Sequence, residues 1–229
     1  MPRRPDLAPL ATPPLRTPDR TAYTARERAL IDRLTTPHEV QQYLHGFTYN
    51  RDKTLRTFRG VTALGRAHCL EAVFFTAAIL EHHGYPPTVL DIESDDGLDH
   101  VLFLFRHKGK WGTVARSRDY GLHGRRPVFS SITALVRSYH DAYVDGSGRV
   151  NGYGVAHLDL LTRANWRLSS RSVWQVERDL IDMPHYPLPM GDARYERMLR
   201  RFMAFRERGT PWNARTARTL YGDQTQHWW

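Results

Sequence analysis

Cysteine is almost absent from this sequence, and the single thiol, Cys69, is the first constraint on its function. One cysteine cannot form an internal disulfide, and it excludes every zinc site built from several thiolates. A chain without disulfides suits a reducing compartment, so we expect the protein to be cytoplasmic. The position of the one thiol therefore carries more information than the number of thiols.

Long hydrophobic runs are also missing. No uninterrupted apolar stretch reaches the roughly 18 to 20 residues needed to span a bilayer, and the N-terminus lacks the apolar region of a secretory signal. We therefore expect no membrane partner. Residues 1–20, "MPRRPDLAPLATPPLRTPDR", contain repeated prolines, which predict a disordered arm. Residues 21–190 are expected to form one domain, and residues 191–229 a basic helical extension.

Acidic residues are in deficit, with 24 Asp and Glu against 33 Lys and Arg, and the formal net charge is +9. Such a balance permits binding to nucleic acid. The charges are scattered, however, except in the arginine-rich segment "MLRRFMAFRERGTPWNARTAR" near the C-terminus. We therefore do not expect a nucleic-acid partner, and a basic nucleic-acid-associated protein is kept only as a further alternative.

The most strongly predicted helix surrounds the cysteine. Residues 67–83, "AHCLEAVFFTAAILEHH", are apolar almost all round, as in a helix enclosed by core, and Gly84 ends it. Downstream, an apolar strand and a second strand starting at Trp111 are expected to form a hairpin around residues 108–109. Other helices are predicted in residues 21–34, 36–46, 132–143, 169–183 and 195–207, and a glycine-rich loop in residues 144–154.

A thiol at a helix N-terminus has a chemical consequence. The helix dipole and the unpaired backbone N–H groups both favour the thiolate, which is the nucleophilic form. The same N–H groups could stabilise an oxyanion. A cysteine nucleophile also needs an imidazole within hydrogen-bond reach and a third group that orients the ring. His100 is the best candidate for the imidazole, because it begins the apolar strand "HVLFLF", where a polar ring needs a reason.

Two side chains are candidates for orienting His100. If residues 108–109 form a two-residue turn, the register of the hairpin brings Ser117 opposite His100. Ala115 and Asp119 are then diagonal neighbours on the same face of the sheet. Either Ser117 or Asp119 could accept the imidazole N–H, whereas a shift of one residue in the register would remove both.

At this point the sequence resembles a known family. "GRAHCLEAVFFTAAILEHHGYPP" is similar to the core of transglutaminase-like proteins, a papain-like cysteine superfamily in which the cysteine helix precedes a strand with histidine, here in Asp99-His100-Val101. The third residue, normally aspartate, follows a tryptophan on the next strand, as in "KWGTVARSRD". The segments "AHCLEA", "DHVL" and "GLHGRRPVF" also resemble a bacterial branch of the superfamily. The resemblance covers residues 36–138.

The resemblance implies an α+β fold with a papain-like core, in which a buried cysteine-bearing helix packs on a small antiparallel sheet with extra helices. It also implies acyl transfer or hydrolysis through a cysteine thioester, with a peptide, protein or other amide as substrate. Cys69 would attack an amide or ester carbonyl, and His100 would transfer the proton. The third position departs from the pattern, because Ala115 stands nearest to the usual aspartate. A catalytically impaired binding module on the same fold is therefore the alternative to an enzyme.

Each of these residues also has a structural interpretation. Cys69 could be a small buried hydrophobe, His100 a strand-end histidine with satisfied hydrogen bonds, and Asp119 a turn residue. We expect Glu71 to be buried against an arginine and His68 to be exposed at the helix start. The candidates for that arginine are Arg116 and Arg118.

Metal and cofactor chemistry is not expected. His68 and His82 are about 14 residues apart on one helix, so roughly 21 Å separates them and they cannot share an ion. No HExxH-like pair occurs, and the glycine-rich "GSGRVNGYG" lacks the lysine of a phosphate-binding loop.

Overall fold

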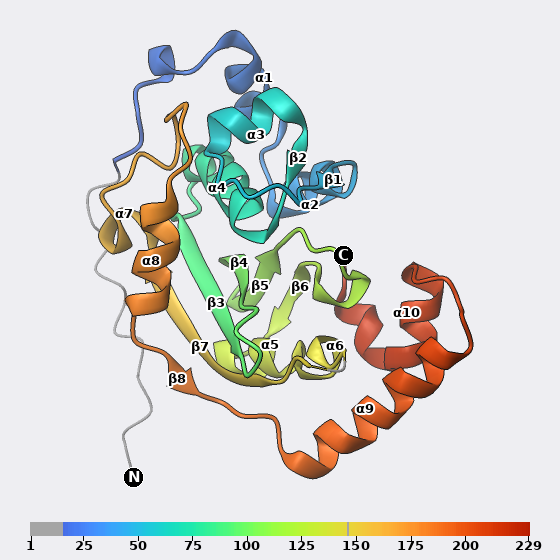
Figure 1. The fold of residues 1–229 in the computed structure, drawn as a ribbon. Helices are drawn as coiled ribbons and strands as arrows, with labels where there is room; N and C mark the ends of the chain where they lie inside the picture. The colour runs from blue at the N-terminus through green and yellow to red at the C-terminus, as the bar shows by residue number, and fades with distance from the viewer. Residues whose placement is uncertain (1–15, 146) are drawn as a thin grey trace.

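A six-stranded antiparallel sheet forms the centre of the protein (Figure 1). The computed structural model describes residues 16–145 and 147–229. Neighbouring strands follow the order β6-β5-β4-β3-β7-β8. In chain order they are β3 (Thr88–Ser94), β4 (His100–His107), β5 (Lys110–Val114), β6 (Arg125–Phe129), β7 (Val150–His157) and β8 (Tyr186–Pro187). A separate parallel pair, β1 (Thr48–Tyr49) and β2 (Arg66–Ala67), precedes the cysteine helix.

Ten α-helices occur in the described residues, so the protein mixes helices with an antiparallel sheet, as an α+β fold requires. They are α1 (Ala25–Arg33), α2 (Pro37–His45), α3 (Phe58–Leu64), α4 (Cys69–Leu80), α5 (Ile132–Arg137), α6 (His140–Tyr143), α7 (Leu158–Leu161), α8 (Trp174–Asp182), α9 (Asp192–Glu207) and α10 (Ala214–Tyr221). The short 3-10 turns are η1 (Arg20–Ala22), η2 (Glu81–His83), η3 (Tyr120–Leu122) and η4 (Gly222–His227).

The predicted cysteine helix is confirmed as α4. Every residue from Leu70 to Leu80 is buried, as its apolar circumference requires. The helix begins at Cys69, two residues later than the pattern suggests, and its last turn tightens into η2. Gly84, with φ of 80°, ends it in the left-handed conformation that favours glycine.

Helices cover both faces of the sheet. Side chains alternate along β4, so Val101, Phe103 and Phe105 join the core that contains α4, while Leu102 and Leu104 join the core that contains α5. Figure 1 accordingly shows α1 to α4 on one side of the sheet and α5 and α6 on the other. The buried cysteine helix packed on an antiparallel sheet is thus the predicted arrangement.

The β4–β5 hairpin has the predicted turn. Lys108 and Gly109 have φ values of 47° and 76°, a pair of positive values that matches the twist of the flanking strands. The register is also the predicted one, with His107 opposite Lys110. The ladder ends at the pair Phe103 and Val114, however, so the chain leaves the strand before it reaches Ser117.

The predicted loop over residues 144–154 is wrong in its second half, because β7 begins at Val150 and pairs with β3 in the middle of the sheet. Two of its glycines, Gly152 and Gly154, lie inside the strand rather than in a turn, and side chains pack close to both. A Cβ added to Gly152 would lie 2.6 Å from Glu93 Oε2, and one added to Gly154 would lie 2.4 Å from Met183 Cε. Glycine content, read as a turn signal, therefore concealed a central strand.

The helix predicted over residues 132–143 is divided into α5 and α6. Ser138 N–H donates to Leu135 O in a tight turn, and Ser138 O accepts from the guanidinium of Arg125 at 3.3 Å. A continuous helix would use that carbonyl for its own ladder. The side chain of Arg125 thus marks the position where the helix breaks.

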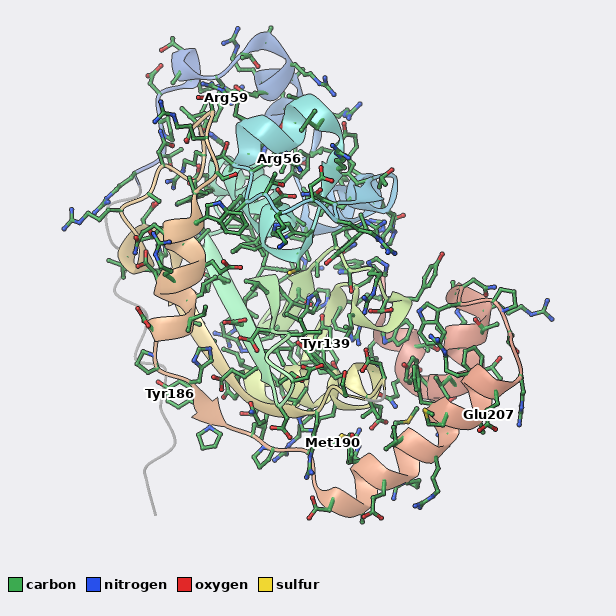
Figure 2. The ribbon with its side chains drawn as sticks, in the orientation of Figure 1. Arg56, Arg59, Tyr139, Tyr186, Met190 and Glu207 are labelled. Carbon is green, nitrogen blue, oxygen red and sulfur yellow. The ribbon has the colours of Figure 1, made fainter. Side chains whose placement is uncertain are left out.

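Both terminal segments contact the body. Of the predicted arm, residues 1–15 lie outside the described residues, whereas Arg16 N–H donates to Asp159 and Thr17 donates to Glu81. At the other end, α9 and α10 form a helical pair with its own apolar cluster, which includes Ala142 of α6. Figure 2 labels Met190 before α9 and Glu207 at its end. A domain boundary at residue 190 stays a prediction.

Candidate active site

Cys69 occupies the first position of α4, where the helix dipole and unpaired N–H groups act on its thiol. The side chain is half-buried in the wall of a cavity. Burial raises the pKa of the Cys69 thiol, but hydrogen bonds with His100 and His68, together with the charges of the two rings, outweigh burial and lower it to about 5. The thiolate therefore predominates at neutral pH.

His100 begins β4 and is only 5% exposed. Its Nε2 lies 2.6 Å from the carbonyl oxygen of Leu122. Because a carbonyl oxygen only accepts, Nε2 carries the proton, and Nδ1 is the nitrogen left to exchange a proton with Cys69. The two residues on which the sequence interpretation depends thus line one cavity, His100 lowers the pKa of the Cys69 thiol, and a backbone carbonyl fixes the tautomer of the ring.

Ser117 and Asp119 line the same cavity as Cys69 and His100. Ser117 Oγ accepts from the N–H of Asp119 at 3.1 Å, and the Asp119 carboxylate accepts from the guanidinium of Arg118 at 3.1 and 3.2 Å. Within residues 16–145 and 147–229, neither side chain has a hydrogen bond with His100. A role for Asp119 or Ser117 in orienting the ring stays a prediction.

Ala115 is engaged through its backbone. Its N–H donates to Gln41 Oε1 and its carbonyl accepts from Gln41 Nε2, both at 3.0 Å. Gln41 lies on α2 and is fully buried, so this pair of bonds fixes the end of β5 against that helix. The Ala115 side chain belongs to the apolar core on the α5 face. This position therefore supplies no carboxylate to the site.

The loop that presents Leu122 is held by Arg125, a residue to which the sequence analysis assigned no role. Arg125 is completely buried. Its guanidinium donates to Gly121 O at 2.6 Å and to His123 O at 2.9 Å, so the carbonyls on both sides of Leu122 are fixed. It lies 4.0 Å above the ring of Tyr139, which connects α5 and α6 (Figure 2). The arginine of "GLHGRRPVF" was the available signal.

His68 was expected to be exposed, and this is wrong. Its side chain is 20% exposed, and its Nε2 lies 3.0 Å from Thr54 O. Burial lowers the pKa of His68, but the bond to Cys69 and the negative charges of Cys69 and Glu71 outweigh it, so the pKa is raised. A second imidazole therefore stabilises the thiolate. The position of His68 directly before the cysteine could have indicated that its ring lies near the thiol.

Glu71 is fully buried, as expected, but its arginine is neither Arg116 nor Arg118. Its carboxylate accepts from Asn50 Nδ2 at 2.8 Å and from the backbone N–H of Arg56 at 2.8 Å, and the Arg56 guanidinium lies 3.6 Å away. Arg56 is labelled in Figure 2. These bonds tie the segment before α3 to the first turn of α4, and thus fix the position of the thiol.

A cavity of about 880 Å³ opens in front of the thiol. Cys69 and His100 form part of one wall, and the C-terminal helical pair contributes Phe202, Phe205 and Trp212 to another. The charged residues that line it are Arg51, Asp96, Asp99, Arg118, Asp119, Asp145 and Arg206. Polar and apolar side chains both line this space.

In the part of the chain that the structure describes, no group of three or more His, Cys, Asp or Glu side chains could hold a metal ion. The same residues contain no helix with the length and apolar character needed to cross a membrane.

Comparisons with known proteins show one weak structural similarity and do not assign a family. No protein-family model matches the sequence, and no curated protein sequence matches it. Among solved structures, LapG of Legionella pneumophila is similar with a TM-score of 0.36 and 12% sequence identity, over 78% of this chain and 92% of LapG. A TM-score of this size supports no inference about activity.

Proposed function

We propose that the protein is a transglutaminase-like cysteine enzyme with a papain-like core, which acts on an amide or ester bond by acyl transfer or hydrolysis. The observation that carries the proposal is the placement of Cys69 and His100 together in the wall of one cavity, where the ring lowers the pKa of the thiol. The Leu122 carbonyl gives the ring the tautomer that a general base needs.

In the proposed reaction, the Cys69 thiolate attacks the carbonyl carbon of the substrate and forms a tetrahedral oxyanion. The backbone N–H groups at the start of α4 stabilise that charge. His100, protonated at Nδ1, donates the proton to the leaving amine or alcohol as the carbon–heteroatom bond breaks, and a thioester remains. His100 then removes a proton from the acceptor, which attacks the thioester and releases Cys69.

The acceptor decides the class of reaction. Water makes the enzyme a hydrolase, and an amine makes it a transferase. We propose a peptide or protein as substrate and a reducing, cytoplasmic environment, which keeps the single thiol free. The group that orients His100 is a backbone carbonyl rather than the carboxylate of a Cys-His-Asp arrangement.

Alkylation of the thiol across pH tests the proposal, because Cys69 is the only cysteine and every labelled molecule reports on it. With iodoacetamide, we expect the rate to follow a thiolate with an apparent pKa near 5 in the wild-type protein. In His100→Ala, the apparent pKa should rise by about one unit or more, because a hydrogen bond to the thiolate is lost.

His107→Ala is the matched control, since this exposed histidine lies at the other end of the same strand and should leave the profile unchanged. Cys69→Ser should not be labelled at all. A wild-type profile with an inflection near 8.5, as for a free cysteine, would contradict the proposal.

One observation favours the alternative, a binding module that has lost catalysis. No carboxylate within the described residues hydrogen bonds to His100, and Ala115 occupies the position nearest to the usual aspartate. A wild-type thiol that is alkylated as a thiolate, yet forms no thioester or product with any peptide amide or ester offered, would favour this alternative over the enzyme.

A further inference from the structure

A second cavity, of about 480 Å³, opens between the body and the C-terminal helices. The segment after β5 contributes Arg116 and Arg118, and α10 contributes Arg218. Trp228 and Trp229 add two indole rings to its lining. No Asp or Glu side chain is among the described residues that line it, so the cavity is cationic and aromatic.

Arg116 has no carboxylate partner in the described part of the chain. Its guanidinium donates to backbone oxygens only, to Phe47 O at 2.8 and 3.2 Å and to Ser117 O at 2.7 Å. The side chain is half-buried, and burial lowers the pKa of Arg116. Carbonyl dipoles offset only part of the cost of removing a cation from water. An anion would complete this site.

The other two arginines differ in their pairing. Arg118 forms an ion pair with Asp119 at 3.1 Å, and Asp119 faces the first cavity rather than the second. Arg218 is exposed on α10 and its guanidinium has no hydrogen bond or ion pair within residues 16–145 and 147–229. Two of the three positive charges around the second cavity therefore lack a counter-ion there.

The imidazoles of the cavity cannot supply negative charge, and they add no repulsion at neutral pH. His45 and His123 also line it, with their rings edge to face at 5.2 Å. Burial and the neighbouring Arg116 lower the pKa of both, and that of His123 falls to about 3. The Nδ1 atom of His123 is buried without a hydrogen-bond partner in the described residues.

We propose that the second cavity binds an oxyanion, a carboxylate or a phosphate group, with Arg116 and Arg218 as its charged ligands. Guanidinium groups suit planar or tetrahedral oxyanions because they donate several N–H bonds in a fixed geometry. The aromatic walls suit the flat or apolar body of a molecule that carries the anion. This site does not use Cys69 or His100, so it stands independently of the proposed catalytic function.

Calorimetric titration of the full chain with inorganic phosphate, and separately with citrate, at low chloride concentration tests the proposal. We expect at least one of the two to bind, and Arg218→Gln and Arg116→Gln each to weaken that binding by about tenfold or more. Arg215→Gln is the matched control. Arg215 is exposed on the same helix, three residues from Arg218, and does not line the cavity.

Binding of phosphate alone would identify a phosphate site, and binding of citrate alone a carboxylate site; either result supports the proposal. Arg116 also bonds to the backbone, so loss of binding in Arg116→Gln counts only if Arg218→Gln, which breaks no internal bond, shows it too. Binding of neither anion, or equal affinity in Arg218→Gln and Arg215→Gln, overturns the proposal.

Discussion

Arg167 and Arg125 are both buried, and they are stabilised in opposite ways. Arg167 is surrounded by negative charge. It donates to Glu81 at 2.6 and 2.8 Å and to Asp159 at 2.7 and 2.8 Å, and it lies 3.8 Å above the ring of Trp166. This network connects η2, α7 and the loop before α8. Removal of any one of its charged side chains would leave the charges of the remaining ones unbalanced in a buried position.

Arg125 has no carboxylate partner in the described residues. Its hydrogen bonds go to backbone and serine oxygens, and its guanidinium lies between the rings of Tyr139 at 4.0 Å and Trp228 at 4.9 Å. Burial lowers the pKa of Arg125 to about 10. Its cation is thus held by dipoles and π faces, and the dipoles belong to the loop that orients His100.

The contrast separates two uses of a buried cation. Carboxylate neighbours are charged themselves, so removal of the cation leaves unpaired buried charges. Carbonyl neighbours are only dipoles, so removal costs less stability but releases the backbone that they belong to. We therefore expect Arg167 to matter chiefly for folding, and Arg125 to matter also for the thiol.

The largest effect is expected from Arg167→Met. Glu81 and Asp159 would remain buried without their partner, which costs about 3 to 5 kcal/mol of unfolding free energy. Urea denaturation followed by circular dichroism measures it. Arg171→Met, at an exposed arginine of the same loop, is the control and should change stability by less than about 0.5 kcal/mol. Equal stability of the two variants would contradict the expectation that Arg167 is needed chiefly for folding.

Arg125→Met should cost less, about 1 to 3 kcal/mol, because it leaves buried carbonyls rather than buried charges unsatisfied. It should also raise the apparent pKa for alkylation of Cys69, since the Leu122 carbonyl is no longer held against His100. Arg167→Met should leave that profile unchanged.

Arg126→Met is the control for Arg125→Met. Arg126 is the next residue in the chain, it is exposed, and its guanidinium makes one long hydrogen bond, to Gln226 O at 3.3 Å. An Arg125→Met protein that is less stable but has a wild-type alkylation profile would mean that Arg125 supports only the fold.

The difference between wild type and Arg167→Met should depend on pH. Arg167 lowers the pKa of Asp159, and it limits the rise in the pKa of Glu81, in which burial is the largest cause. Without Arg167 both folded-state pKa values rise above their unfolded values. Stability from such groups is lost as pH rises through the folded pKa, so the variant regains stability as pH falls.

Denaturation at pH 7 and pH 5 measures this dependence. We expect the gap in unfolding free energy to narrow by about 1 kcal/mol or more at pH 5. Arg171→Met should show a constant gap. A gap that widens at pH 5 would reverse the sign and contradict the account of Arg167 as the partner of ionised carboxylates.

Local features of the fold can be predicted from the sequence, whereas long-range contacts that use backbone atoms cannot. Helix α4 and the turn at Lys108-Gly109 follow from periodicity and residue type. With them follow the position of Cys69 at the start of a helix and that of His100 at the start of a strand. The strand β7 was missed because its glycines were interpreted as a turn signal. The role of the Leu122 carbonyl could not be predicted, because any residue has a carbonyl and no local pattern shows which one a distant imidazole meets.

Trp228 gives the smallest and sharpest test of the comparison. Its Nε1 is buried without a hydrogen-bond partner in the described residues, so replacing the indole loses no hydrogen bond. Trp228→Phe keeps an aromatic face over Arg125, whereas Trp228→Leu keeps bulk without it. We expect Trp228→Leu to be less stable than Trp228→Phe by about 0.5 to 1 kcal/mol, the size of a cation–π contact. In an Arg125→Met background this difference should shrink to the part that the contact of the ring with Tyr221 contributes, because no cation remains for the ring to stabilise. If the difference is unchanged there, Arg125 does not contribute to it, and the π faces do not hold Arg125.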